Sequence, residues 1–254
     1  MKRLYWASVS VALFCGLLLA WKLAADAKLL NPLWFPGPDR AFGKLWEWIA
    51  TGALWDPLGR TVWRMFAGWL AACAVGIALG AAIASSSIAR RLLQPSAEFL
   101  RPLPASAVLP PAILILGLSD AMIVFVVAFG SVWPILLGAI HGFRSLEPRL
   151  AEVSKLLHFG SWSRAWKFHL PSALPDIFAG MRVSIAIALI VTVASEMLSS
   201  QQGIGYLMLV AARAFRSADI FAGIIVLGLL GYLTNHALQK LEDRMLRWRP
   251  GQIS

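Results

Sequence analysis

Residues 144–176, RSLEPRLAEVSKLLHFGSWSRAWKFHLPSALPD, form a polar, basic and tryptophan-bearing segment between two apolar runs. The segment is longer and more aromatic than a turn between two membrane helices needs to be. Its apolar neighbours can each cross the hydrocarbon core of a membrane. We therefore expect the segment to lie at a membrane surface and to dock a partner there.

The composition places the chain among membrane proteins. Hydrophobic residues make up 59% and charged residues 14%, whereas soluble domains average about 45–50% and about 25%. Four apolar runs of roughly 20 residues can each span a bilayer, and they cover residues 4–24, 61–84, 177–198 and 220–238. A fifth apolar stretch, 105–142, is too long for one span, so we expect two spans joined by a turn at 117–120. The predicted fold class is an all-α polytopic membrane protein with about six transmembrane helices.

The first apolar run admits two interpretations. Lys2 and Arg3 precede it and Ala25-Asp26-Ala27 follows it, as in a cleaved secretory signal. The run is longer than the roughly 7–15 residues of a signal's apolar core. We therefore favour an uncleaved membrane anchor.

The distribution of Lys and Arg predicts the orientation, because cytoplasmic loops carry an excess of these residues. The net charge of +10 then sets topology and meets anionic lipid headgroups, so we expect membrane lipid and not nucleic acid as a partner. We also expect both termini in the cytoplasm. With that topology, fourteen of the 23 basic residues fall in inner segments: Lys2, Arg3, Arg90, Arg91, Arg101, Arg144, Arg149, Lys155, Arg164, Lys167, Lys240, Arg244, Arg247 and Arg249.

No pattern in the sequence indicates catalysis, metal binding or nucleotide binding. Cys15 and Cys73 fall inside predicted spans as small apolar residues, so no disulfide framework is expected. The four histidines lack cysteine or carboxylate companions at ligand spacing, and there is no Gly-rich phosphate loop. We expect no catalytic residue, no metal and no cofactor. Any energy that drives this protein must then come from a partner or a gradient.

The second predicted span carries a stripe of small residues on one helix face. Such a stripe lets the backbone of another helix approach closely. We therefore predict a tight helix contact along it. Its members recur at every fourth position: Gly68, Ala72, Gly76, Gly80 and Ala84.

The segment 144–176 shows helical spacing in two parts. Val153, Leu156, Leu157 and Gly160 follow a helical period, and Ser161 is a plausible cap for a second helix that bears Trp162, Ala165 and Trp166. Two short helices that meet near Gly160 would present Phe159 and Trp162 at the tip. These aromatic residues either fill a pocket on a partner or rest at the membrane interface, where Trp is enriched.

A short polar stripe lies in the fifth predicted span, at helical spacing i, i+3, i+4 and i+7. Its members are Thr192, Ser195, Glu196 and Ser199. An ionisable residue inside a span costs about 2.5–3.5 kcal/mol on insertion scales, which favours a functional role. Glu196 is therefore a candidate for a pathway through the membrane or a gate, or else it snorkels to water at the outer end. For Arg182, nearer the inner end, we expect a packing or headgroup role.

The segment 144–176 resembles the cytoplasmic loop motif of binding-protein-dependent ABC importer permeases. The resemblance rests on LAE at 150–152, Trp162 ten residues after Glu152, and LP at 170–171. In that family the loop forms a coupling helix that inserts into a groove on the ATPase subunit. The resemblance implies the following coupling residues: Glu152, Leu156, His158, Phe159, Gly160, Trp162, Leu170 and Pro171. The family usually has Gly where this chain has His158, so we expect the turn to shift toward Gly160.

Further motifs resemble the nitrate, sulfonate and taurine class of these permeases. They are RPLP at 101–104, GLSD at 117–120, ALP at 173–175, GMR at 180–182, ASEM at 194–197 and GIGYL at 203–207. Together the matching segments run from about residue 60 to 238. The resemblance implies a permease core at 61–254, with the coupling loop at 144–176, preceded by a transmembrane helix and outer loop at 1–60.

The resemblance also implies partners and a mechanism. We expect an ABC ATPase subunit that binds ATP, a periplasmic or lipid-anchored solute-binding protein, and a second copy of the chain, all at a bacterial inner membrane. The solute would be small, such as a sulfonate, taurine or nitrate. The alternative is a gradient-driven carrier or a membrane-embedded enzyme that works without an ATPase.

Overall fold

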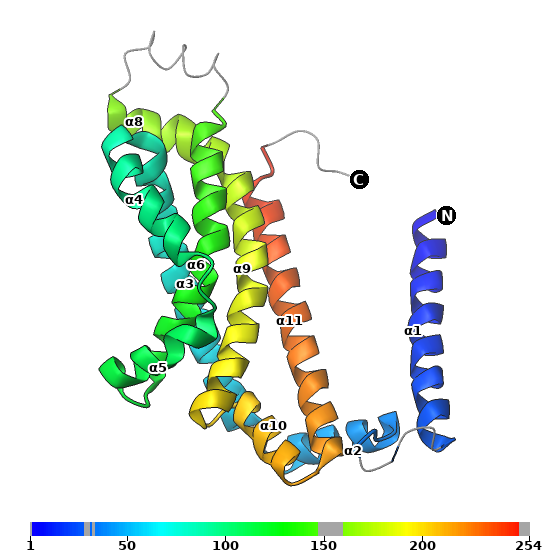
Figure 1. Ribbon diagram of the computed structural model, residues 1–254. Helices are drawn as coiled ribbons and strands as arrows, with labels where there is room; N and C mark the ends of the chain where they lie inside the picture. Colours follow the sequence, from blue (N-terminus) through cyan, green and yellow to red (C-terminus); the bar gives the residue numbers. More distant parts are fainter. Residues whose placement is uncertain (1, 28–30, 32–33, 147–159, 249–254) are drawn as a thin grey trace. The chain divides into compact units, whose positions relative to one another are not determined.

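The computed structural model describes residues 2–27, 31, 34–146 and 160–248 of the 254-residue chain. The described residues are largely helical and contain no strand (Figure 1). They divide into two compact units, Met1–Arg60 with Gln202–Leu229, and Thr61–Gln201 with Leu230–Ser254. The segment Gln202–Leu229 thus groups with the N-terminal part of the chain.

The first unit contains α1 (Lys2–Asp26), α2 (Pro38–Ala50), α10 (Ile204–Arg213) and the first parts of α3 and α11. Helix α1 covers the first predicted span, 4–24. Helix α2 has Pro38 in its first turn, where the missing N–H has no helical acceptor to lose. The core of this first unit contains five buried residues: Trp48, Leu54, Ile204, Ala222 and Val226.

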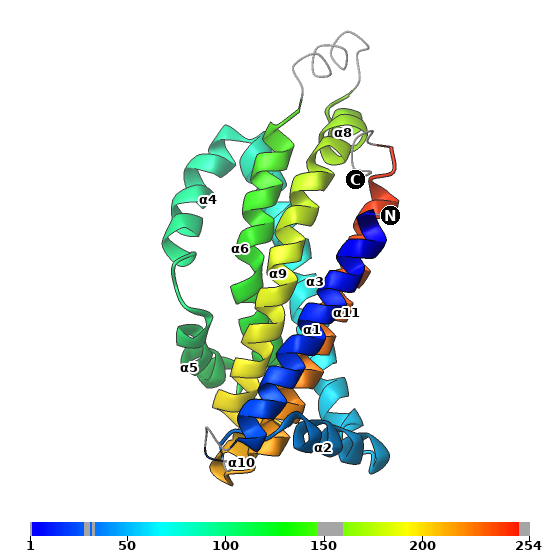
Figure 2. The same ribbon diagram turned by 90° about the vertical axis from the view of Figure 1, so that its right-hand side faces the viewer.

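The second unit holds most of the membrane-spanning helices (Figures 1 and 2). It begins within α3 (Trp55–Ser85) and ends with the last part of α11 (Ser217–Met245). Between them lie α4 (Ser87–Leu100), α5 (Ala105–Leu116), α6 (Asp120–Arg144), α8 (Ser161–Arg164), the π-helix η1 (Ala165–His169) and α9 (Leu170–Ser199). Helices α6 and α9 lie side by side in both views, and they supply much of the core around Ile123, Ile135 and Ile185.

Four helices in the described residues are long and apolar enough to cross a membrane: Trp55–Ser85, Asp120–Arg144, Trp166–Ser199 and Ser217–Met245. The sequence predicted a complete span that begins at residue 105. Helix α5, which occupies this place, has only 12 residues and is about 18 Å long, so it is too short to cross a membrane alone. Helices α4 and α5 pass the same test only as a pair, bent by 102°. Pro102 and Pro104 occupy this bend, and proline cannot continue a helical hydrogen-bond ladder.

Close backbone contacts hold α3, α6 and α9 together. A Cβ built on Gly68 would lie 2.6 Å from Val127 Cγ1, and one on Gly76 would lie 3.1 Å from Ile135 Cβ. Gly80 approaches Ala139 in the same way. Each partner lies 59 positions further along the chain, so α3 and α6 run parallel in constant register. Gly142 likewise packs on Ala173 and Gly180 on the carbonyl of Pro134, so α6 and α9 run antiparallel.

The parallel arrangement of α3 and α6 determines the path of the chain between them. Helix α3 ends at one end of the pair and α6 begins at the opposite end. Residues 86–119 must therefore travel back along the whole length of these helices. The bent pair α4–α5 makes this crossing, so it is a broken span.

Candidate functional site

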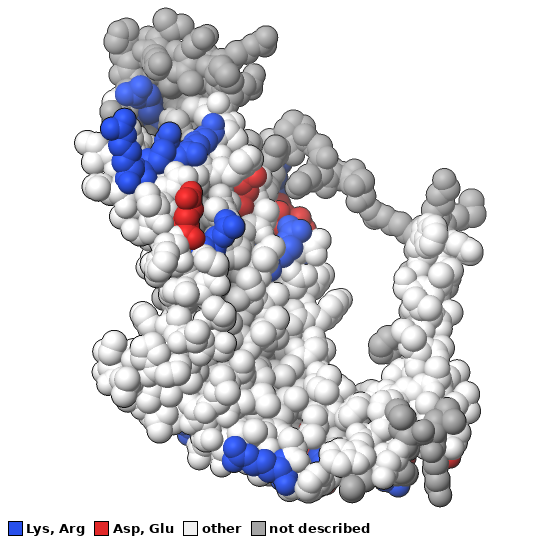
Figure 3. All heavy atoms as spheres, viewed as in Figure 1, with Lys and Arg blue, Asp and Glu red and all other residues white. Residues whose placement is uncertain are grey.

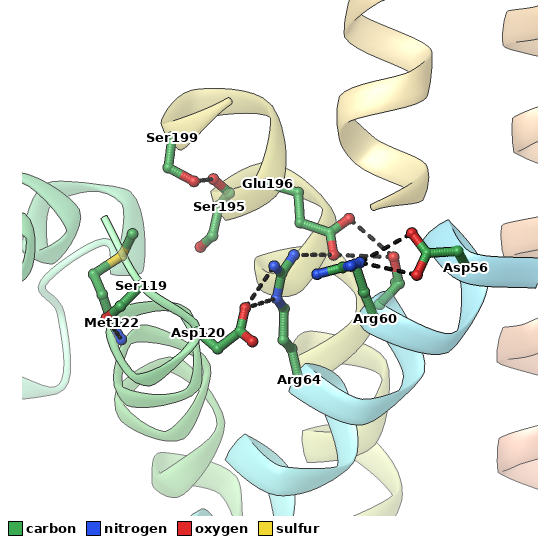
Figure 4. A network of polar contacts seen from close by, with 10 residues as sticks. Asp56, Arg60, Arg64, Ser119, Asp120, Met122, Ser195, Glu196 and Ser199 are labelled. Atoms are coloured by element: carbon green, nitrogen blue, oxygen red, sulfur yellow. Dashed lines mark hydrogen bonds and ion pairs between the residues drawn. The ribbon is translucent and has the colours of Figure 1, made fainter. Parts of the chain in front are cut away.

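A cluster of buried charges lies where α6 begins and α9 ends (Figure 4). Arg64 of α3 donates from Nη1 to Glu196 Oε1 of α9 at 3.1 Å. It also donates from Nη2 and Nε to Asp120 Oδ1 of α6, at 2.6 and 2.8 Å. The Thr61 hydroxyl donates to both Glu196 carboxylate oxygens, at 2.9 and 3.0 Å. One guanidinium thus joins three helices.

The cluster is enclosed on its α3 and α9 sides. Arg64 is 1% exposed, and Thr61 and Glu196 are 0% exposed, whereas the Asp120 side chain is 53% exposed. A buried charge is tolerated when it is paired and hydrogen-bonded, and Glu196 meets both conditions. Glu196 therefore does not snorkel to water, and that interpretation of the sequence was wrong.

The local sequence explains how these side chains meet. Arg64 lies one turn before Gly68, so the register of α3 against α6 places it beside the first turn of α6. Ser119 caps α6 by accepting a hydrogen bond from the backbone N–H of Met122 at 3.3 Å. Asp120 then stands at the helix N-terminus, where a negative charge is favoured by the helix dipole. The antiparallel α9 brings Glu196 to the same end.

Two other members of the polar stripe bond to the backbone of their own helix. Thr192 and Ser199 donate to the carbonyls of Ala188 and Ser195, at 2.7 and 2.6 Å. Thr192, Ser195 and Ser199 are buried. The structure therefore places all four stripe residues inside the helix bundle, with only Glu196 reaching across to another helix.

The sequence patterns did not identify Arg64 and Asp120 as partners of Glu196. A signal was present, because Arg64 is the one basic residue in the run 61–84 and Asp120 adjoins the next apolar run. An ionisable residue in a span needs a partner, and these two lie at the same predicted depth as Glu196. The pairing itself depends on the parallel register of α3 and α6, which no local pattern reveals.

The predicted coupling residues are described only in part. Glu152, Leu156, His158 and Phe159 lie outside the described residues. Gly160 is exposed, and its carbonyl accepts from the Arg164 N–H at 3.0 Å. Ser161 is therefore the first residue of α8. The sequence had suggested that Ser161 caps this helix.

Trp162 lies in α8, and Leu170 and Pro171 begin α9. Between them η1 makes a π-helical turn from Ala165 to His169. Pro171 has no N–H to donate to the preceding turn, and the wider π turn directly before it leaves the chain helical throughout 161–199. The predicted coupling segment is thus joined to α9 without a loop.

Basic side chains gather at this end of the second unit. Figure 3 shows Lys and Arg over α8 and the adjoining end of α4, whereas the surface along the helices is mostly uncharged. Arg90 and Arg91 of α4 and Lys167 of η1 are exposed. Farther along α9, Arg182 bonds through Nη2 to Glu242 Oε2 of α11, so Arg182 has a protein partner.

Within the residues that the structure describes, no group of three or more His, Cys, Asp or Glu could hold a metal ion. The charged cluster consists of paired groups without a free nucleophile. Its contacts join α3, α6 and α9 at one end of the second unit.

Comparison with known proteins shows what the chain is similar to. Residues 74–247 match the family described as "Binding-protein-dependent transport system inner membrane component". The chain is 30% identical over 229 residues to a Bacillus subtilis protein whose name assigns it to aliphatic sulfonate transport as a permease, covering 90% of this chain and 83% of the relative. An Escherichia coli protein with the same name is 31% identical, with coverages of 92% and 89%. The taurine transport system permease protein of Escherichia coli is 26% identical, with coverages of 95% and 90%.

Proposed function

The chain belongs to the family of binding-protein-dependent transport system inner membrane components, and from this premise we propose that its solute is a small sulfonate. As a member of this family it is a membrane permease subunit of an ABC importer and not an enzyme. The family favours this function over a gradient-driven carrier or a membrane-embedded enzyme. ATP hydrolysis belongs to a separate subunit.

The names of the relatives support the solute class. Two relatives, at 30% and 31% identity, are named for aliphatic sulfonates, and a third is named for taurine, which is itself a sulfonate. Another, at 28% identity, is a bicarbonate transport permease of Synechocystis. These solutes share a small size and an anionic group, and the sulfonates are the most frequent among them.

Three partners and one orientation complete the proposal. An ATPase subunit binds the coupling segment around Glu152 and Trp162, and a solute-binding protein delivers the sulfonate at the outer face. A second copy of the chain completes the pathway within the inner membrane. Both termini lie in the cytoplasm, together with the basic end of the second unit. The uninterrupted helix from Ser161 to Ser199 supports the coupling role, because a push on α8 reaches α9 directly.

We further propose that Glu196 acts as a gate residue, with Thr192, Ser195 and Ser199 beside it. Its contacts with Arg64 and Thr61 join α9 to α3 at the end opposite α8. Movement of α9 after ATP binding would have to break or carry these contacts. A ligand shifts such an equilibrium only by its differential affinity for the two states, and the cluster supplies contacts that differ between them.

The proposed function is tested by transport in proteoliposomes that contain the permease with its co-encoded ATPase. Radiolabelled ethanesulfonate or taurine is added outside together with the co-encoded binding protein, and ATP is enclosed. We expect ATP-dependent accumulation of a sulfonate and no accumulation of a neutral analogue such as ethanol. Uptake without ATP, or ATP-dependent uptake of only non-sulfonate solutes, would contradict the proposal.

A further inference from the structure

The broken span α4–α5 carries polar side chains on one helix face. Arg90, Gln94, Glu98 and Arg101 follow each other at intervals of four, four and three residues, which places them in one stripe along α4 and its C-cap. Arg90, Glu98 and Arg101 are exposed in the chain. Gln94 donates from Nε2 to Glu98 Oε1 at 2.8 Å. The stripe begins at the α8 end and extends to the bend.

A neighbouring face of α4 is largely apolar and faces α3 and α6. It borders a cavity of about 590 Å³ between α3, α4 and α6. Leu93, Ala97 and Leu100 line this cavity from α4, and Val75 and Phe125 line it from α3 and α6. Of the polar stripe, Arg90 donates to the carbonyls of Ile83 and Ala84 at the end of α3, both at 3.4 Å. Gln94, Glu98 and Arg101 are not among the residues that line the cavity.

The bend of the broken span lies at membrane depth. Residues 86–119 make one crossing, and the bend at 101–104 is in the middle of them. Arg101, Pro102, Leu103 and Pro104 are all exposed in the chain. Non-helical backbone at this depth is tolerated only where protein covers it or where it lines a water-filled cavity. The same holds for charged side chains such as Glu98 and Arg101.

Lipid cannot satisfy these side chains, so water or a second protein must surround them. The Arg101 guanidinium has no hydrogen bond or ion pair with any side chain in the part of the chain that the structure describes. It has five N–H donors in a planar fork that matches the oxygens of an oxyanion. A sulfonate presents three such oxygens around one negative charge.

We propose that Gln94, Glu98 and Arg101 line the water-filled translocation pathway, and that Arg101 binds the anionic group of the solute at the bend of α4–α5. The pathway part follows from the geometry of the broken span. The solute part rests on the proposed function, because it takes the solute to be a sulfonate. Glu98, held by Gln94, limits the residence of the anion by keeping a negative charge one turn away.

Thiol accessibility tests the pathway part. Glu98→Cys and, as matched control on the cavity side of the same helix, Leu93→Cys are made in a chain with Cys15→Ala and Cys73→Ala. A charged methanethiosulfonate is applied to membrane vesicles that contain the permease with its ATPase. We expect Glu98→Cys to react at least tenfold faster than Leu93→Cys. Equal rates, or an unreactive Glu98→Cys, would overturn the proposal and point to a dry contact with a second copy or with lipid.

Substitution of Arg101 tests the solute part. We expect Arg101→Gln to lower sulfonate uptake at least tenfold, and Arg101→Lys to lower it less because the charge remains. Arg91→Gln, near the start of α4 and outside the proposed solute site at the bend, is the control and should retain uptake. Co-purification with the ATPase should be unchanged in all three variants, which separates solute binding from assembly.

The outcomes distinguish the two proposals. Wild-type uptake of a sulfonate together with unaffected uptake in Arg101→Gln would refute the role of Arg101 and leave the proposed function intact. A wild-type assembly that transports no sulfonate would refute the proposed solute, and the thiol accessibility of Glu98→Cys would still decide the pathway.

Discussion

Arg64 and Glu196 are 132 residues apart in the sequence and form a buried ion pair at 3.1 Å between α3 and α9. The exposed fraction is 2% for the Arg64 side chain and 0% for the Glu196 side chain. The pair is reinforced by Thr61 on the Glu196 side and by Asp120 on the Arg64 side. The ion pair joins α3 directly to α9, whereas the glycine contacts pack each of these two helices against α6.

Arg64→Leu should destabilise the permease strongly, because Glu196 would remain buried without its cation. Removing one partner of a buried pair costs about 3–5 kcal/mol. The double variant Arg64→Leu/Glu196→Leu should be less destabilised than the single variant. Thermal unfolding of the detergent-purified permease, monitored by size-exclusion chromatography, measures the stability of both variants.

Arg60→Gln is the matched control for this prediction. Arg60 pairs with Asp56 one turn along α3, and both side chains are exposed, so the pair should contribute no more than about 1 kcal/mol. If Arg64→Leu and Arg60→Gln shifted the unfolding temperature equally, the charged cluster would have no special role in stability.

The packing of α3 on α6 leads to a second prediction. Gly76→Leu should destabilise the permease by about 1–3 kcal/mol through overpacking, because a Cβ at Gly76 already lies 3.1 Å from Ile135. Gly59→Ala in the same helix meets nothing within 4 Å, and it should stabilise by roughly 0.5–1 kcal/mol because alanine favours a helix over glycine. Thermal unfolding of the two variants should therefore change in opposite directions. Equal tolerance of both substitutions would contradict close packing at Gly76.

Sequence patterns predicted the apolar helices well and the connections between them less well. The runs that form α3, α6, α9 and α11 are apolar enough to be identified as spans from hydropathy alone. The stripe from Gly68 to Gly80 indicated a closely packed neighbouring helix. The pattern could not say that the neighbour is α6 in parallel register. That register depends on how α4 and α5 return the chain, which is a property of the whole unit.

The broken span and the π turn show a second limit of sequence patterns. Hydropathy alone divided 105–142 into two spans at 117–120, whereas the first crossing begins at residue 86 and is bent at the prolines 102 and 104. A proline normally interrupts a helix, but the π turn at η1 directly precedes Pro171 and the chain stays helical through it. In both places the decisive factor is which backbone acceptors lose their donors, and tertiary contacts determine how that loss is accommodated.

The coupling proposal predicts the behaviour of Glu152→Ala and Trp162→Ala. Each should weaken co-purification with the ATPase, and a residue that anchors the interface costs about 2 kcal/mol or more on truncation, which is about a 30-fold loss of affinity. Uptake should fall with it, and membrane insertion should be unchanged. Trp63→Ala, an exposed tryptophan of α3, is the control. Unchanged co-purification and uptake in both coupling variants would count against the docking role.

The ion pair between Arg182 and Glu242 should matter less than the Arg64 cluster. Arg182 is 47% exposed at its side chain and Glu242 10%, so water screens the pair and reduces its contribution to at most about 1 kcal/mol. Arg182→Gln should lower the unfolding temperature only slightly. Exchange of the charges in Arg182→Glu/Glu242→Arg should recover most of the loss seen in Arg182→Glu alone, since α9 and α11 would attract each other again. If the exchange gave no recovery, the two residues would be neighbours without a favourable interaction, and the join between α9 and α11 would depend on apolar packing.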